Sequence, residues 1–124
     1  MKTAYTTSPW GAVQDTTVLA DGICSVTTAS HGGLKLDAIR QALMPEHWRQ
    51  PGGWYEEDCD WCLPFIIFQK EILAHGDDCA VRNIRDSRHV EILRDWHPDK
   101  YEVWFKTTLK LGESYIRDHP LRKG

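Results

Sequence analysis

PGGWYEEDCDWC, residues 51–62, is the stretch around which the rest of this chain is organised. It places two Trp, one Tyr, four carboxylates and two Cys within twelve positions, directly after a Pro-Gly-Gly turn. Aromatic rings favour burial, whereas carboxylates resist burial unless they are paired or hydrogen-bonded. The stretch therefore needs a partner elsewhere in the fold, a metal ion or an external binding surface.

Length and composition indicate one soluble globular domain. The chain has 124 residues, of which 41% are apolar and 27% charged, and this length can bury a core without disulfides. No run approaches the roughly 20 apolar residues of a membrane span. Residues 1–5 carry no apolar signal core, so we expect a cytoplasmic protein without a membrane partner. We expect a single domain over residues 1–124, with residues 1–8 and 119–124 flexible.

The charge distribution argues against a protein that holds nucleic acid by bulk electrostatics. The net charge is −3; residues 1–62 hold 4 Lys and Arg against 8 Asp and Glu, and residues 63–124 hold 11 against 10. A possible basic face on a late helix is interrupted by Asp86, Glu91 and Asp95, which is typical of a solvated surface. Nucleic acid is therefore not expected as a direct ligand, although an arginine set would be its candidate site: Arg82, Arg85, Arg88 and Arg94.

The order of the predicted elements indicates an α+β fold, with a short N-terminal antiparallel sheet packed against three or four C-terminal helices. Residues 12–19 and 23–28 are rich in β-branched side chains, and the Asp-Gly turn between them predicts a β-hairpin. Residues 34–36 predict a further short strand. Two glycines, Gly32 and Gly33, allow either a sharp turn or a close approach by a ligand or another chain.

Helix signals follow the predicted strands. Asp37 is a good N-cap for a helix through Leu43, and residues 63–74 predict a buried helix that Asp58 or Asp60 caps and Gly76 ends. A strand over residues 65–68 is the alternative there. Asp77 and Asp78 predict the start of a helix over residues 79–96, and Pro98 the start of another. Ile39, Ala42 and Leu43 are expected to share one helix face, and Tyr101, Val103, Trp104 and Phe105 to lie near the core.

Four residues have the spacing of a small zinc site: Cys59, Cys62, His75 and Cys79. Thiolate and imidazole are the ligands that tetrahedral Zn²⁺ prefers, and cysteines in a cytoplasmic chain favour thiols or a metal over disulfides. Against zinc, the linker is nearly all apolar, Pro64 follows Cys62 closely, and a chain of this size needs no metal to fold. A structural zinc site is therefore one alternative for this stretch, and no cofactor is the other.

The four carboxylates of the stretch also permit acid–base chemistry or binding of a hard metal. So many like charges need positive partners, for which five arginines are candidates: Arg40, Arg49, Arg82, Arg85 and Arg88. A hydrolase or nuclease-like enzyme would use His31 as base with Asp58, Asp60 and Cys59, whose pKa a nearby helix start would lower. No phosphate-binding Gly-rich loop, Ser elbow or dinucleotide motif is present.

Several short motifs together resemble a family of uncharacterised domains found in phages, plasmids and other mobile elements of bacteria. They are Ser8-Pro9-Trp10-Gly11 with Gln14, Gly22-Ile23 through Ser30-His31-Gly32-Gly33, Gly52 to Trp61, Trp96-His97-Pro98-Asp99 with Tyr101-Glu102, and Gly112 to Tyr115. The resemblance spans roughly residues 8–118, and Cys62 is not part of it. It implies a mobile-element accessory protein in the cytoplasm of a bacterial host, and it brings no established activity.

Small proteins of this kind most often bind a host machine, and inhibitors of CRISPR-Cas or restriction systems are the obvious class. Such inhibitors occlude a site through a few desolvated aromatic or charged side chains. We therefore expect a non-enzymatic inhibitor that binds a host defence protein through an acidic aromatic surface. The residues expected to make this surface are Trp54, Tyr55, Glu56, Glu57, Asp58 and Asp60.

Overall fold

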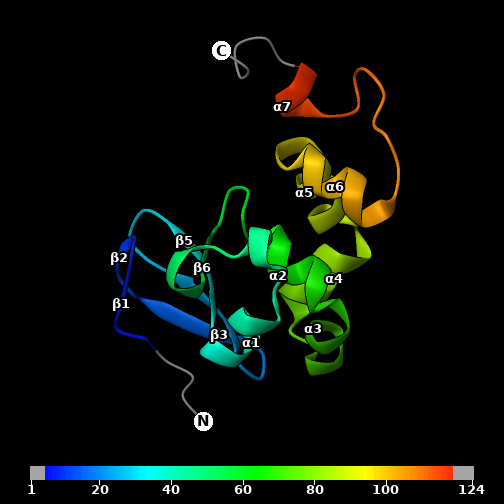
Figure 1. Cartoon of the computed structure of the whole chain (residues 1–124). Coiled ribbons are helices and arrows are strands. Elements are labelled where there is room, and N and C mark those ends of the chain that lie inside the picture. Colours follow the sequence, from blue (N-terminus) through cyan, green and yellow to red (C-terminus); the bar gives the residue numbers. More distant parts are fainter. Residues whose placement is uncertain (1–4, 119–124) are drawn as a thin grey trace.

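The computed structural model describes residues 5–118 and confirms the α+β fold (Figure 1). The strands gather on one side of the molecule, helices α2–α6 lie on the other, and α7 lies beyond α5 and α6. The strands are β1 (Thr7–Ser8), β2 (Gly11–Ala12), β3 (Asp15–Ala20), β4 (Ile23–Thr27), β5 (Gly32–Leu36) and β6 (Trp54–Glu56). The helices are α1 (Ala38–Leu43), α2 (Cys62–Ile67), α3 (Gln69–His75), α4 (Asp78–Arg85), α5 (Arg88–Trp96), α6 (Pro98–Phe105) and α7 (Tyr115–Asp118), with short 3-10 turns at Glu46–Trp48 and Pro51–Gly53.

Four strands form one antiparallel sheet in the order β3-β4-β5-β6, and β1 pairs with β2 beside it. The predicted hairpin is confirmed as β3 and β4, and the predicted short strand as β5. In the β5–β6 pair Leu34 lies opposite Tyr55, and Lys35 lies opposite Trp54. Because successive side chains of a strand point to opposite faces, Leu34 and Tyr55 join the core and Lys35 and Trp54 lie on the outer face.

The double glycine at the start of β5 serves a close approach within the chain itself. A Cβ atom on Gly33 would collide with the Trp10 ring and with the Tyr55 carbonyl oxygen, and one on Gly32 would lie 2.8 Å from the Val26 carbonyl oxygen. Glycine therefore lets Trp10 cover the outer face of the sheet at this point.

Helix α2 is buried on almost every side, as its uninterrupted apolar sequence requires. The predicted helix over residues 63–74 is confirmed as helical, and the alternative strand over residues 65–68 is wrong. The helix is divided at Phe68 (φ −109°, ψ 27°) into α2 and α3, and Gly76 ends α3 in the left-handed conformation as predicted. Asp58 and Asp60 do not cap α2, because its N-cap is Trp61 and makes no side-chain cap hydrogen bond.

Two of the other caps are confirmed, and one predicted helix is divided. Asp37 caps α1 by accepting from the Arg40 N–H, and Asp77 caps α4 by accepting from the Ala80 N–H. The helix predicted over residues 79–96 breaks into α4 and α5 at Ser87, whose φ is 57°. That conformation is costly for a residue other than glycine and stops helix propagation.

One core lies between the sheet and the helices. It is built from side chains of β3 to β6 on one side and of α2, α3, α4 and α5 on the other. Its fully buried members include Ile23, Leu36, Met44, Tyr55, Leu63, Ile72 and Leu93.

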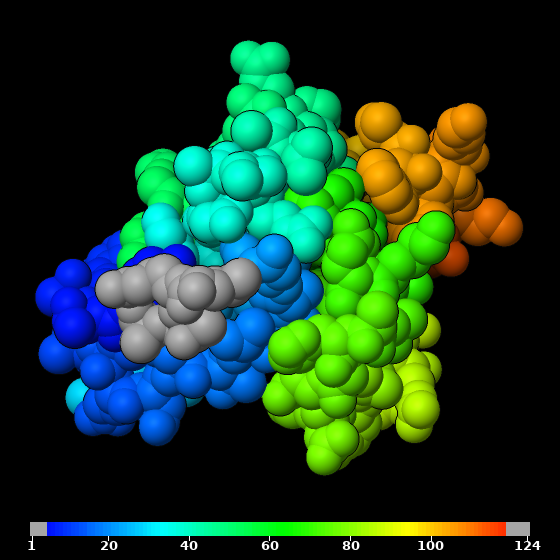
Figure 2. Space-filling model, turned by 90° about the horizontal axis from the view of Figure 1, so that it is seen from below, coloured from blue at the N-terminus to red at the C-terminus, as the bar shows by residue number. Residues whose placement is uncertain are grey.

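Two helices carry apolar side chains at the surface, and for α6 this contradicts the prediction that Val103 and Phe105 lie near the core. Ile39 and Leu43 of α1 are 73% and 60% exposed, and Val103, Trp104 and Phe105 of α6 are 73%, 45% and 42% exposed. Figure 2 shows α1 (cyan) and α6 (orange) at the surface of the same view. Tyr101 is packed against the core, and the partly exposed Trp104 ring contacts the buried Trp48 ring, with the two centroids 5.4 Å apart. A period of 3.6 places residues on one side of a helix, and it does not say that a neighbour covers that side.

Helix α7 is fastened to α6 by Arg117, whose guanidinium contacts Glu102 (Nη1 to Oε2, 2.8 Å) and Asp99. These hydrogen bonds and one from the Leu109 N–H lower the pKa of Glu102 to about 2.

A helix that crosses a membrane is not found among residues 5–118, where every helix is too short or too polar to do so. Of the end segments predicted to be flexible, residues 1–4 and 119–124 lie outside the described residues. Thr7 and Ser8 lie within them and form strand β1, which pairs with β2.

Two glycines with positive φ provide a matched test of chain packing. Gly53 (φ +78°) would place a Cβ 2.6 Å from the Leu36 carbonyl oxygen, whereas Gly112 (φ +89°) has no atom within 4 Å. We expect Gly112→Ala to cost about 1–2 kcal/mol of unfolding free energy for its backbone conformation alone. Gly53→Ala should cost about 1–3 kcal/mol more because of the collision. Urea denaturation measures both, and equal losses would contradict the close approach to Leu36.

The burial of His89 predicts that the free energy of unfolding falls in acid. Its side chain is 2% exposed, its Nε2 lies 2.7 Å from Gln69 Oε1, and its Nδ1 is buried without a hydrogen-bond partner in residues 5–118. Burial lowers the pKa of His89, so the unfolded chain binds a proton more readily than the folded one. Stability should therefore fall as the pH drops below about 6.5, the ordinary value for histidine.

The pH dependence of the urea midpoint between pH 7.5 and 5.5 measures this effect. His89→Leu should flatten it, and His47→Gln, at an exposed position, should leave it unchanged. A wild-type slope that survives in His89→Leu would assign the acid sensitivity to another group.

Candidate functional site

Residues 56–60, here called the acidic turn, connect the end of β6 to α2. The Glu57 N–H donates to the Gly32 carbonyl and holds the turn against β5 (3.0 Å). The Asp60 and Trp61 N–H groups both donate to the Glu56 carbonyl, at 3.2 and 2.9 Å. The backbone of the turn is therefore fixed by the sheet and by its own hydrogen bonds.

Tyr55 cannot belong to a contact surface, and its predicted role is wrong. The residue is 0% exposed, and its hydroxyl donates to Gln41 Oε1 (2.6 Å) and accepts from the Gln50 N–H (3.4 Å). Burial raises its pKa. Alternation along β6 explains this outcome, because Tyr55 faces the core while Trp54 and Glu56 face outward.

Trp54 is half-buried and is largely occupied by its own chain. Its ring makes edge-to-face contacts with Trp10 and Tyr5, at centroid distances of 5.6 and 5.8 Å. The Lys35 ammonium lies 4.9 Å from its centroid, in a cation–π contact, and also donates to the Gly52 carbonyl. Trp54 thus offers an external partner part of its ring.

Three of the four carboxylates of the acidic turn, those of Glu56, Glu57 and Asp60, contact backbone N–H groups or histidines. Glu57 Oε1 lies 3.5 Å from His31 Nδ1, and Asp60 Oδ1 lies 3.3 Å from His97 Nε2. Glu56 accepts from the backbone of the turn, and burial together with Asp58 raises its pKa. Glu57 and Asp58 are exposed.

No arginine or lysine of residues 5–118 forms an ion pair with these four carboxylates. The prediction that arginines balance these carboxylates is therefore wrong. Arg40 pairs with Glu71, and Arg88 pairs with Glu91. Arg49 donates to the carbonyls of Ala42 and Met44, and Arg82 and Arg85 lie exposed on α4. The described part of the protein leaves the acidic turn without a strong cationic partner.

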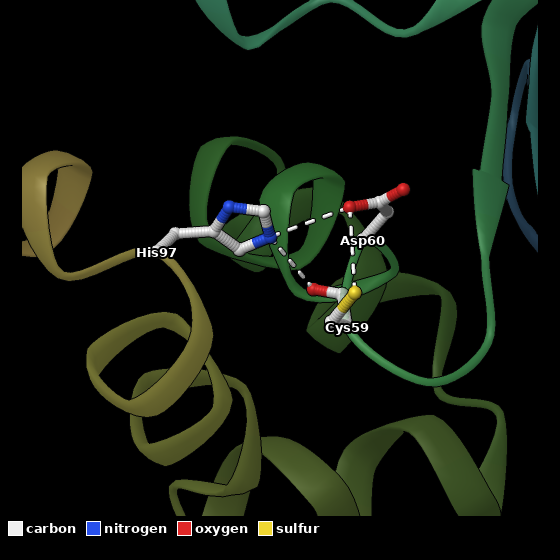
Figure 3. A group of neighbouring side chains, drawn as sticks. All are labelled: Cys59, Asp60 and His97. Carbon is white, nitrogen blue, oxygen red and sulfur yellow. Dashed lines mark hydrogen bonds and ion pairs between the residues drawn. The ribbon is translucent and has the colours of Figure 1, made fainter. Parts of the chain in front are cut away.

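Cys59, Asp60 and His97 converge on one point, as Figure 3 shows. Cys59 Sγ and His97 Nε2 lie 3.8 and 3.3 Å from Asp60 Oδ1, and the three ligand atoms all lie within 4.8 Å of one another. His97 Nε2 also lies 3.1 Å from the Cys59 carbonyl oxygen. His97 stands between α5 and α6, so this contact joins the acidic turn to the distant helical end of the chain.

The four ligands of the alternative zinc site do not come together as a group. In residues 5–118 one group of at least three potential ligands converges, and it is Cys59 with Asp60 and His97. Cys62 is buried at the start of α2, whereas His75 and Cys79 are exposed on α3 and α4. Sequence spacing missed His97 because 38 residues separate it from Cys59. The motif Trp96-His97-Pro98-Asp99 contains the one signal that could have found it.

The alternative catalytic set of His31, Asp58 and Cys59 is not assembled either. His31 is exposed and pairs with Glu57, and within the described chain it makes no hydrogen bond to Asp58 or Cys59. Burial and the charges of Asp60 and Glu56 raise the pKa of Cys59 to about 12, opposite to the expected lowering.

A cleft of about 450 Å³ lies between the sheet and α4, and Glu57 lines it together with Asp77, Cys79 and Asn83.

The raised pKa of Cys59 predicts that its thiol reacts slowly with alkylating agents. Because Cys59 stays protonated at neutral pH, iodoacetamide should modify it much more slowly than the exposed Cys79. Peptide mapping by mass spectrometry after timed alkylation at pH 8, with a chelator present, measures the two rates. Faster labelling of Cys59 than of Cys79 would show that the thiolate is stabilised after all.

No curated protein and no solved structure matches this chain. One family, described as a domain of unknown function (DUF7007), has a sequence model that matches residues 3–123, nearly the whole length. The chain therefore belongs to the DUF7007 family.

Proposed function

We propose that this protein acts by binding a partner protein through its acidic turn, and that the partner belongs to a bacterial defence system of the CRISPR-Cas or restriction type. The observation that carries the binding role is the lack of any arginine or lysine partner for the acidic turn in residues 5–118, with Glu57 and Asp58 exposed. The protein would then work by occlusion, without catalysis.

The charge pattern supports a basic partner surface. Adjacent like charges repel, and a partner that brings arginine or lysine relieves this repulsion and speeds association. A surface that normally holds nucleic acid has this character. Glu57 and Asp58 make the outer contacts, Glu56 and Asp60 are less exposed, and the exposed part of Trp54 adds an apolar contact.

The class of partner is supported by the sequence resemblance to domains of phages, plasmids and other mobile elements. Proteins of such elements meet host defence in the bacterial cytoplasm, where a small binding protein suffices to block a site. The mobile-element origin and the host cytoplasm belong to the same proposal.

Catalysis through His31, Asp58 and Cys59 has less support. A thiol with a pKa near 12 is almost entirely protonated at neutral pH and is a poor nucleophile. His31 has Glu57 as its partner, so it is not positioned to activate that thiol. Binding therefore explains the acidic turn better than a hydrolase or nuclease does.

Two charge-reversal variants with the same change in net charge test the binding role. Glu57→Lys/Asp58→Lys alters the acidic turn, and Glu46→Lys/Asp86→Lys alters exposed acids elsewhere. Each protein is expressed in bacterial strains that carry one defined CRISPR-Cas or restriction system, and phage plating efficiency is measured. Wild type and the control should raise plating in at least one strain, and the acidic-turn variant should not.

Binding to the purified defence protein from that strain then gives the affinity. The acidic-turn variant should bind about tenfold more weakly or worse, and wild-type affinity should fall as salt is added. Unchanged plating in every strain would contradict the partner class. Equal activity of the two double variants would contradict the acidic turn as the contact.

A further inference from the structure

The geometry points to a binding site for one divalent transition-metal ion of the zinc class, held by Cys59, Asp60 and His97. This inference is independent of the proposed partner. It concerns the inner side of the acidic turn, whereas the proposed contact uses the exposed Glu57 and Asp58.

Two distances between ligand atoms are close to those of tetrahedral coordination, and the third, from Cys59 Sγ to His97 Nε2, lies within 4.8 Å. Zinc bonds of about 2.0 to 2.3 Å at tetrahedral angles place ligand atoms about 3.3 to 3.6 Å apart. His97 Nε2 lies 3.3 Å from Asp60 Oδ1, and Cys59 Sγ lies 3.8 Å from the same oxygen. An ion at their centre would therefore draw Cys59 Sγ closer to the other two ligand atoms.

The donor set selects the class of ion. One sulfur, one imidazole nitrogen and one carboxylate oxygen form a mixed set that suits Zn²⁺ and Co²⁺, whereas Mg²⁺ and Ca²⁺ require mostly oxygen ligands. A second carboxylate oxygen, Glu56 Oε1, lies 3.8 Å from Cys59 Sγ and supplies further negative charge beside the site. Glu56 or a water molecule can complete the fourth position.

The surroundings hold the three donors in place. The Asp60 and His97 side chains are 23% and 15% exposed, so an ion is partly shielded from water but reachable. The turn is fixed by hydrogen bonds to the Glu56 carbonyl, and His97 is fixed by its N–H bond to the Leu93 carbonyl (2.8 Å). Bound metal would replace the present contacts of His97 Nε2 with Asp60 and the Cys59 carbonyl, and it would displace the Cys59 proton to solvent.

Titration of the metal-free protein with Co²⁺ tests this site directly, because cobalt bound by a thiolate gives a charge-transfer absorption band that water or carboxylate ligands do not give. Wild type should saturate at one Co²⁺ per chain with this band, and Zn²⁺ should abolish it by displacement. Cys59→Ser, which keeps the side-chain size, should lose the band. His97→Gln should weaken cobalt binding about tenfold or more.

Cys79→Ser is the matched control, because Cys79 is exposed and lies outside the three-residue group. It should keep the wild-type band and stoichiometry, and circular dichroism should show native helix content in all variants. Should His97→Gln fail to fold, Asp60→Asn replaces it. Absence of a saturable band in wild type, its persistence in Cys59→Ser, or its loss in Cys79→Ser would each overturn the assignment.

Discussion

The pairing of β6 with β5 is the contact on which the rest of this structure depends. Three residues of β6 attach to the sheet, and this attachment buries Tyr55, turns Trp54 outward and leaves the acidic turn at the sheet end. Glycine at position 33 makes the pairing possible, because any larger side chain would displace Trp10 or the β6 backbone. The acidic and aromatic character of residues 54–60 is thus divided between core and surface by strand alternation.

The acidic turn is balanced in an unusual way for a group of four carboxylates. Within residues 5–118 its ion-pair partners are His31 and His97, whose rings carry a charge only when protonated, and its other partners include backbone N–H groups. Buried charge normally calls for a full cationic partner. The turn avoids that requirement by keeping Glu57 and Asp58 in water, so it retains negative charge that a basic protein surface can use.

Local signals in the sequence predicted local structure well. The β-branched runs on either side of Asp21-Gly22 gave the hairpin, and the capping roles of Asp37 and Asp77 followed from their positions before helices. The same reasoning failed where structure depends on distant neighbours. It placed Val103 and Phe105 near the core and Tyr55 at the surface, because a periodic pattern does not identify the element that covers it. His97 was missed for the same reason, since no local spacing connects it to Cys59.

The contact of His97 with the Cys59 carbonyl also bears on how the protein folds. It closes a separation of 38 residues, so the chain must lose considerable conformational freedom before this contact can form. The hairpin of β3 and β4 needs only neighbouring residues and can form early. The acidic turn can close its own backbone hydrogen bonds without distant segments, but its inner side is completed only when the segment between α5 and α6 docks against it.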